Sequence, residues 1–211
     1  MRIVQATSSD IDKYVDQLPD LMHATGPVTY DYQFLGRDLF NAVVKASWAA
    51  PGTLFGFDGC RLALDADELL GIEVGFPGPE FELRKKALAP VWNELIEKAI
   101  VPADDLREIA RRTYLAGYLN VAIPKPVHYI HALSVKPEHR GKGIGAELVG
   151  HAMQLGKDAG MRGLHLDVLS DNPAVEFYRA LGMHCLAETR APMPAEHGVP
   201  MEMRMAIDFQ V

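Results

Sequence analysis

The stretch His139–Ala146 reads HRGKGIGA, with a glycine at every second position from Gly141 to Gly145. Glycine has no Cβ, so alternating glycines let successive backbone N–H groups turn toward one point. The pattern predicts a strand before this stretch and a helix after it, and a helix N-terminus adds partial positive charge. We therefore expect a binding site for phosphate oxygens here. The alternative is a glycine-rich turn that only lets the strand and the helix pack closely.

Two other nucleotide-binding motifs fit this stretch less well. Residues 141–146 match the G-x-G-x-x-G/A pattern of dinucleotide-binding folds, but there the glycines directly follow the first strand and an acidic residue ends the second. Here residues 136–140 separate the strand from the glycines, and Asp167 lies inside its predicted strand. The sequence also contains no G-x-x-x-x-G-K-S/T motif. A nicotinamide-dependent oxidoreductase is therefore disfavoured and a P-loop enzyme is excluded.

The segments on either side of the glycines form a predicted β-α-β unit. A strand spans 129–135, a helix follows with apolar residues at helical spacing from Ile144 to Leu155, and a second strand spans 164–169. Asn172 and Pro173 supply an N-cap and a first-turn proline for a short helix. Two further strands are predicted at 184–189 and 201–209. The last one alternates apolar and charged residues, which is typical of a half-buried strand with one polar face.

The N-terminal half predicts two helices and a β-hairpin. A short strand at residues 3–4 precedes a helix that Asp10 caps and that runs to about residue 22, and a second helix begins at about Arg37. Gly26-Pro27 is expected to break the chain between the two helices. Segments 61–65 and 69–76 then predict an antiparallel hairpin, in which one face of the second strand carries Leu70, Ile72, Val74 and Phe76.

Residues 77–126 have a different character. Apolar residues recur at helical spacing, and Pro90 and Pro102 stand where helices begin, so we expect a helical insertion between two strands. The whole chain of 211 residues fits one domain with this insertion at about 77–126.

Composition narrows the function classes. Hydrophobic residues make up 48% and charged residues 23%, as in ordinary soluble proteins, and no apolar run is long enough for a membrane span. The formal charge of −7 disfavours nucleic-acid binding, and the first residues lack a secretory signal, so cytoplasmic localisation is expected. The two cysteines, Cys60 and Cys185, have no metal-ligand spacing, and no metal is predicted.

Two motifs together resemble the GCN5-related N-acetyltransferase (GNAT) family. Arg140, Gly143 and Gly145 match its Q/R-x-x-G-x-G/A signature, and Asn172–Met183 resembles its second motif, except that the asparagine stands one place closer to Tyr178 than usual. The resemblance covers about residues 129–183, which would be the acyl-CoA-binding core. It implies an α/β (α+β) fold with a mixed, mostly antiparallel sheet and flanking helices.

The resemblance also implies roles for individual residues. Backbone N–H groups of the glycine-rich stretch would hold the pyrophosphate of an acyl-CoA, and the strand before it would partner the pantetheine arm. Tyr178 would be the general acid that protonates the departing thiolate, and Asn172 would cap its helix and touch the cofactor. The cofactor-binding residues are thus Leu133, Ser134, Val135, Arg140, Gly141, Lys142, Gly143, Ile144, Gly145, Ala146 and Asn172.

The group that deprotonates the amine is left open among His128, His131 and Glu73, since a histidine or glutamate is the expected base. The implied function is transfer of an acyl group, usually acetyl, from acyl-CoA to a primary amine through a tetrahedral intermediate. A non-catalytic acyl-CoA-binding or regulatory module is the alternative. The acceptor is a small-molecule or peptide amine, and a homodimer is considered through the methionine-lined last strand.

Overall fold

The computed structural model describes residues 1–209, which form a seven-stranded sheet in the order β1-β2-β3-β4-β5-β7-β6. The strands β4 and β5 are parallel, and every other neighbouring pair is antiparallel. This confirms the predicted mixed, mostly antiparallel sheet. The strands are β1 (Arg2–Gln5), β2 (Cys60–Asp65), β3 (Glu68–Pro77), β4 (Val127–Val135), β5 (Gly163–Leu169), β6 (His184–Thr189) and β7 (Glu202–Asp208).

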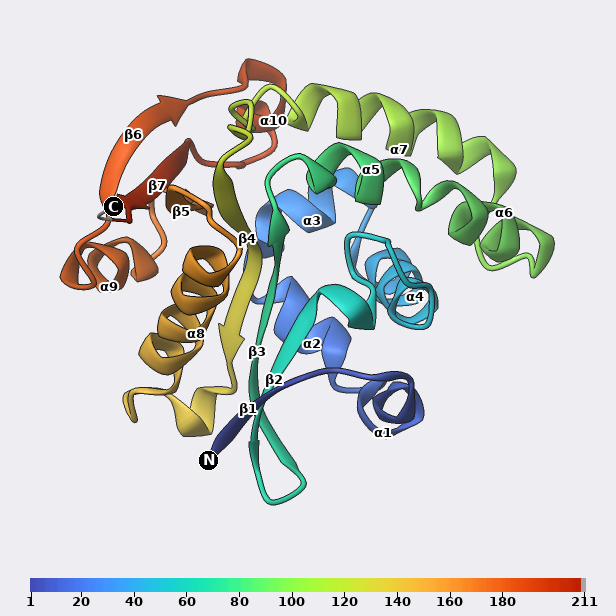
Figure 1. Ribbon diagram of the computed structural model, residues 1–211. Helices are drawn as coiled ribbons and strands as arrows, with labels where there is room; N and C mark the ends of the chain where they lie inside the picture. Colours follow the sequence, from blue (N-terminus) through green and yellow to red (C-terminus); the bar gives the residue numbers. More distant parts are fainter. Residues whose placement is uncertain (210–211) are drawn as a thin grey trace.

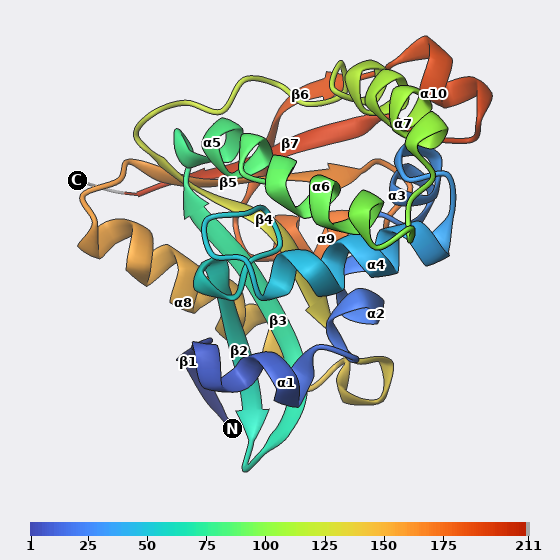
Figure 2. The ribbon, with the colours of Figure 1, turned by 90° about the vertical axis from the view of Figure 1, so that its right-hand side faces the viewer.

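Helices cover both faces of the sheet. In Figure 1, α8 lies on one side of β4 and α1 to α4 lie on the other, and Figure 2 shows α4, α6 and α7 lying across the sheet on that second side. Within residues 1–209, every helix is too short or too polar to span a bilayer. The α-helices are α1 (Ile11–Tyr14), α2 (Leu18–His23), α3 (Pro27–Gln33), α4 (Arg37–Trp48), α5 (Glu80–Lys86), α6 (Ala89–Glu97), α7 (Ala103–Ala116), α8 (Ile144–Asp158), α9 (Ala174–Ala180) and α10 (Pro192–Glu196).

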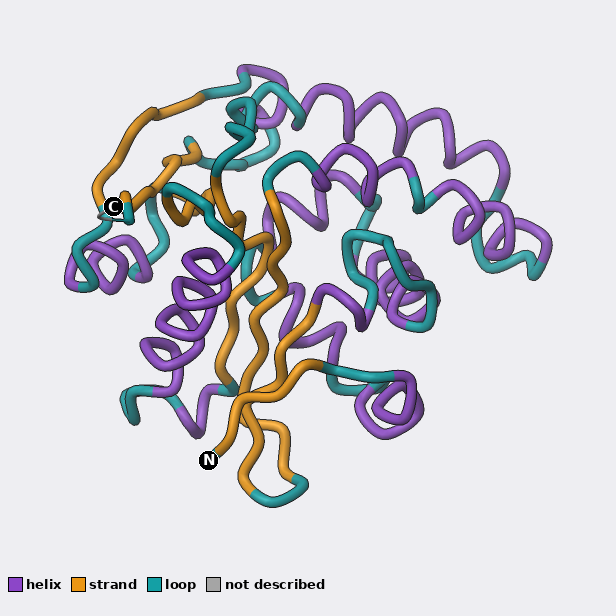
Figure 3. The backbone as a smooth tube through the Cα atoms, viewed as in Figure 1, coloured by secondary structure: helices purple, strands orange, loops and turns teal. Residues whose placement is uncertain are grey.

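The segment between β3 and β4 is helical, as predicted. Figure 3 shows helices in this region, and along the chain α5, α6 and α7 follow one another between the two strands. Pro90 lies in the first turn of α6, and Pro102 occupies the N-cap position of α7. The buried faces of α6 and α7 pack against α4 and α3 respectively. The insertion therefore lies on the same side of the sheet as the N-terminal helices and packs against them.

The N-terminal helices differ from the prediction. The single helix expected from Asp10 to about residue 22 is divided into a 3-10 turn, α1 and α2, and Pro19 lies in the first turn of α2. Gly26-Pro27 separates α2 from a further helix that was not predicted, because Pro27 is the first residue of α3. Proline at a first helical position has no N–H to leave unpaired, so it starts a helix as readily as it ends one.

The β2–β3 hairpin is confirmed, but one of its side chains faces the other way. The register of the pair shifts between Ala63 and Leu64, which is a β-bulge. As a result Leu70 packs with Ile144 and Leu148 under α8, whereas Ile72 and the alternate residues after it pack toward α1 to α4. A bulge inserts one residue, so it reverses the alternation that the sequence pattern assumed.

The last strand lies inside the sheet. Within the described chain β7 pairs with β5 on one edge and with β6 on the other, so it offers no free edge to a second subunit. The polar face predicted for this strand is only partly exposed, because Asp208 is exposed and Glu202 is half-buried, whereas Arg204 is only 2% exposed. Met203, Met205 and Ile207 alternate along β7 and pack on the side of α8 and α9. The core that they join also contains Val149 and Val175.

Candidate active site

The two parallel strands separate and leave a wedge-shaped opening. The strands β4 and β5 pair only from Val127 to Ile130 and from Gly163 to Leu166, although both continue further. A cavity of about 1170 Å³ occupies this opening and continues between α3 and the helical insertion. The edge of β4 that faces the wedge, from His131 to Val135, therefore presents backbone groups to the cavity.

The glycine-rich loop closes one end of the cavity. Gly141 and Gly143 have φ angles of 74° and 83°, in the left-handed region that favours glycine. Within residues 1–209, the N–H groups from Gly141 to Ala146 donate to no protein acceptor, and the last three of them belong to the first turn of α8. The Arg140 N–H differs, because it donates to the Pro137 carbonyl oxygen. The loop therefore has the unpaired donors and positive helix end that an oxyanion needs.

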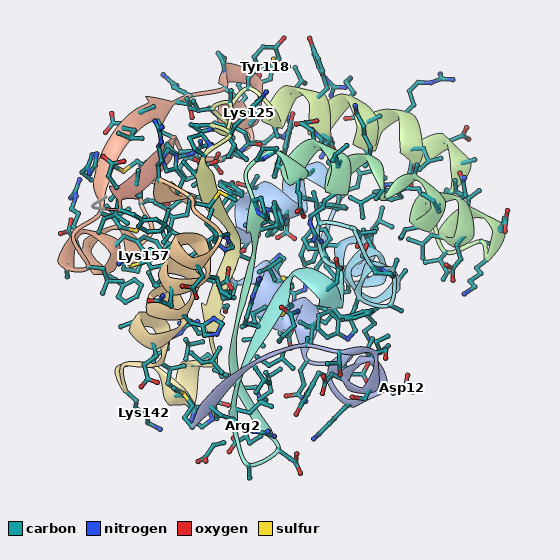
Figure 4. The ribbon with its side chains drawn as sticks, in the orientation of Figure 1. Arg2, Asp12, Tyr118, Lys125, Lys142 and Lys157 are labelled. Atoms are coloured by element: carbon teal, nitrogen blue, oxygen red, sulfur yellow. The ribbon has the colours of Figure 1, made fainter. Side chains whose placement is uncertain are left out.

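The side chains of this loop take a smaller part. Lys142 extends from the outer end of the loop into solvent in Figure 4, and it does not line the cavity. The Arg140 guanidinium donates from Nε to the Val135 carbonyl oxygen at 3.0 Å and ties the loop to the end of β4. A Cβ added at Gly145 would come within 3.3 Å of the Phe177 ring, so this glycine also lets α8 approach α9.

The residues predicted to flank the pantetheine arm all border the cavity, and so do Asn172, Phe177 and Tyr178 of the second motif. The side chains of Leu133 and Val135 pack toward α8, which leaves their main chain to face the wedge. Asn172 Oδ1 accepts from the Ala174 N–H at 2.9 Å, as expected of a cap. Tyr178 is 6% exposed and lines the cavity, and its hydroxyl makes no hydrogen bond within the described residues. Burial alone raises the Tyr178 pKa well above its usual range, so the phenol stays protonated at neutral pH.

The three predicted base candidates do not lie together on one face. His128 and Glu73 face α8, His128 beside Gly156, and neither lines the cavity. Glu73 is fully buried, with Arg61 Nη1 at 3.7 Å and His128 Nε2 at 3.9 Å, distances too long for hydrogen bonds. Of the four residues named as catalytic from the sequence, the structure brings His131 and Tyr178 to the cavity.

His131 reaches the cavity because of a second β-bulge. Val74 pairs with Ala132 and Gly75 pairs with Ile130, which leaves His131 as the extra residue of β4. Its ring packs among Phe55, Phe76 and Phe81, and its Nε2 has no hydrogen-bond partner within residues 1–209. Burial first, and then the charge of Arg84, lower its pKa to about 4. The imidazole is therefore neutral at pH 7.

A polar cluster that the sequence did not predict borders the cavity where β5 meets β7. The guanidinium of Arg204 binds Asp167 with two hydrogen bonds, Nε to Oδ1 at 2.5 Å and Nη2 to Oδ2 at 2.7 Å. The Tyr129 hydroxyl donates to Asp167 Oδ2 at 3.0 Å, and Glu202 lies two residues before Arg204 on the same face of β7. Tyr129, Asp167 and Glu202 all line the cavity. The sequence signal for this cluster was the alternation of charged residues in the last strand. Only the order of the strands in the sheet shows that the charged face of that strand borders the cavity.

Comparison with known proteins finds acetyltransferases, as the resemblance in the sequence predicted. A model of the acetyltransferase (GNAT) family matches residues 82–183. A Bacillus subtilis protein whose name proposes a ribosomal protein bS18 alanine N-acetyltransferase is 33% identical over 93 residues, which cover 44% of this chain and 60% of that protein. A thialysine N-epsilon-acetyltransferase from Bos taurus is 39% identical over 61 residues, which cover 28% of this chain and 36% of that enzyme. The chain thus spans less than two thirds of each of these relatives.

The fold is shared over nearly the full length with a solved structure. The N-acetyltransferase from Staphylococcus aureus Mu50 matches with a TM-score of 0.69 and 12% identity, over 98% of this chain and 100% of that one. An identity this low shows the fold alone. The match to residues 82–183 covers the glycine loop, the wedge and Tyr178. Residues 82–183 therefore match the GNAT family of acetyltransferases, and nearly the whole chain shares the fold of a solved N-acetyltransferase.

Proposed function

We propose that this protein is an acyl-CoA-dependent N-acyltransferase. The acyl group that we expect it to transfer is acetyl, and the acceptor is a primary amine. The observation that carries the proposal is the row of N–H groups from Gly141 to Ala146, which have no acceptor in the described part of the chain and lie at the end of the wedge that Tyr178 lines. Backbone donors at a helix start bind phosphate oxygens, and a strand edge beside them binds an extended amide-containing chain. A site with these two parts suits the pyrophosphate and the pantetheine arm of a coenzyme A thioester.

The reaction follows from groups that border the wedge. The amine must be neutral to attack the thioester carbonyl, and a backbone N–H near Leu133 is the proposed donor to the oxyanion of the tetrahedral intermediate. Tyr178 is the proposed donor to the departing sulfur, because its phenol is protonated and free of other hydrogen bonds in the described part of the chain. The protein holds both reactants in one cavity, which replaces a bimolecular encounter by a positioned one.

The acceptor side of the cavity is large, and several aromatic side chains line it. It is bordered by α3, the loop before β2, and the insertion, with Tyr30, Phe34, Phe55, Phe81 and Trp92 among its side chains. The two curated relatives are named for different amines, an alanine of a ribosomal protein and the thialysine side chain. We therefore propose a primary amine on a small molecule or a peptide as the acceptor class, and the cavity favours one with an apolar body.

Ligand-induced stabilisation tests the proposal. Acetyl-CoA at a hundred times its Kd is expected to raise the free energy of unfolding by about 2.7 kcal/mol, and NAD is expected to leave the melting temperature unchanged. Thiol release is then followed with 2-phenylethylamine, spermidine and a peptide with an N-terminal alanine. Acetyl-CoA binding without turnover on any amine would favour a non-catalytic binding module, and stabilisation by NAD alone would overturn the assignment.

The loop glycines offer a more specific test. Gly143→Ala places a Cβ on a residue with φ of 83°, which costs about 1–2 kcal/mol, and no other atom crowds that Cβ. Relief of this strain turns the neighbouring N–H groups away from their common point, so the affinity for acetyl-CoA should fall about tenfold in calorimetric titration.

The matched control is Gly150→Ala. Gly150 is an exposed residue inside α8, its added Cβ also meets no atom, and its φ is not in the left-handed region. This change should stabilise the helix by about 0.5–1 kcal/mol and leave the affinity for acetyl-CoA unchanged. Equal affinities of both variants would show that the loop main chain does not hold the ligand.

A further inference from the structure

Glu202 stands at the point where the wedge opens. It is the first residue of β7 and pairs with Leu169, the last residue of β5, three positions beyond the final β4–β5 pair at Leu166. The half-buried Glu202 side chain lines the cavity that Tyr178 also lines. Both residues therefore face the space in which the proposed reaction would occur.

Among the described residues, no cationic side chain forms an ion pair with Glu202. The neighbouring Arg204 is fully engaged, because it binds Asp167 with two hydrogen bonds and donates to the main-chain oxygens of Val121 at 2.7 Å and Ala122 at 3.4 Å. Glu202 accepts one hydrogen bond, from Asn120 Nδ2 to Oε2 at 2.9 Å, and its Oε1 accepts none within residues 1–209. One carboxylate oxygen is thus available to a ligand in the cavity.

The surroundings of Glu202 raise its pKa toward the neutral range. Burial first, and then the negative charge of Asp167, raise its pKa to about 8, while Arg204 and the hydrogen bond from Asn120 oppose the rise. The other titratable groups that face it are Tyr129 on β4 and Tyr30 on α3, whose own pKa values are raised by burial, so both stay neutral. By contrast, His131 binds a proton too weakly to take one from an ammonium, whose pKa is near 10.

The geometry points to Glu202 as the residue that binds the ammonium group of the acceptor and accepts its proton, with Oε1 as the accepting atom. The inference deepens the proposed acyl transfer and rests on it. Asp167 would not compete for the amine, because both of its carboxylate oxygens already accept hydrogen bonds from Arg204. Its charge nevertheless favours a proton on Glu202, which a base needs if it is to take a proton from an ammonium.

The proposed step balances as follows. The ammonium nitrogen gives one proton to Glu202, and its freed electron pair bonds to the thioester carbonyl carbon while the C=O π pair moves to oxygen. The oxyanion then re-forms the C=O bond as the C–S bond breaks, and the C–S electron pair goes to sulfur, which takes a proton from Tyr178. The second proton to leave nitrogen restores the one on Tyr178, and Glu202 releases its proton to solvent. The products are an amide, a thiol and one solvated proton.

The test compares Glu202→Gln with Glu188→Gln. Glutamine keeps an oxygen for Asn120 and removes the titratable group, and Glu188 is an exposed residue of the adjacent strand β6 that does not line the cavity. With acetyl-CoA and the best amine of the panel, Glu202→Gln should lower kcat/KM about 100-fold at pH 7.5, and Glu188→Gln should not change it. The kcat/KM of the wild type should level off near pH 8, whereas that of Glu202→Gln should keep rising toward the pKa of the amine.

A second measurement does not depend on turnover. A pKa raised from 4.5 to about 8 contributes stability that is complete below pH 4.5 and is lost as the pH rises through 8. The melting temperature of the wild type, relative to Glu202→Gln, should therefore fall between pH 5 and 8.5. Glu202→Asp, which keeps the charge on a shorter side chain, should recover part of the lost kcat/KM.

The outcomes separate the two proposals. A wild type that acetylates no amine although it binds acetyl-CoA contradicts the proposed function. A wild type that is active, with a Glu202→Gln variant of equal kcat/KM and the same pH profile, overturns the role of Glu202 and leaves the acyltransferase assignment intact. If Glu202→Gln does not fold, the pH profiles of the wild type and of Glu202→Asp decide: a limb near pH 8 in both supports the role, and no such limb overturns it.

Discussion

Replacement of Tyr178 by phenylalanine is expected to lower the turnover number about 100-fold, while acetyl-CoA binds as tightly as before. The phenol lines the wedge and has no other hydrogen-bond partner in the described chain, so the change removes only the donor to the departing sulfur. A thiolate is a fairly stable leaving group, with a pKa near 8.5, which places the effect at the lower end of the range for acid catalysis. Stopped-flow or steady-state thiol release measures the turnover number.

Stability provides the check on this result. The Tyr178 side chain lines the cavity and its hydroxyl makes no hydrogen bond within residues 1–209, so Tyr178→Phe removes no stabilising contact and should unfold at about the same temperature as the wild type. Tyr118→Phe removes an exposed hydroxyl that bonds to Tyr114 and does not line the cavity, and it should leave turnover unchanged. Unchanged turnover in Tyr178→Phe would refute its role as the acid.

The parts of the site that were predictable from the sequence are local. The glycine spacing, the strand before it and the helix after it lie within one continuous stretch, and the β-α-β unit around them was predicted for the same reason. Asn172 and Pro173 signal their helix by residues that act within one turn. Such signals need no knowledge of what lies beside them in space.

The rest depends on pairing between distant segments. Asp167 and Arg204 meet because β7 inserts between β5 and β6, an order that no spacing in the sequence indicates. The direction of His131 likewise depends on a bulge in its pairing with β3, because a one-residue shift changes which face a side chain occupies. Without the bulge, strict alternation from Leu133 would have turned His131 toward α8, on the face that Glu73 occupies and away from the cavity.

The same distant pairing predicts a large effect on stability. Asp167→Ala should lower the free energy of unfolding by about 3–5 kcal/mol, because it leaves the guanidinium of Arg204 buried with only carbonyl oxygens as partners. The Tyr129 hydroxyl loses its acceptor in the same change. Urea unfolding at pH 7 measures the loss.

Two further variants decide whether the buried charge is the cause. Glu176→Ala removes the partner of Arg179 in an exposed ion pair, and it should change the free energy of unfolding by less than about 1 kcal/mol. Asp167→Leu combined with Arg204→Met removes both charges together and should recover most of the stability lost in Asp167→Ala, since an unpaired ion costs more than an absent pair. A double variant as unstable as Asp167→Ala would mean that the shape of the pair, and not its charge, stabilises the junction of β5 and β7.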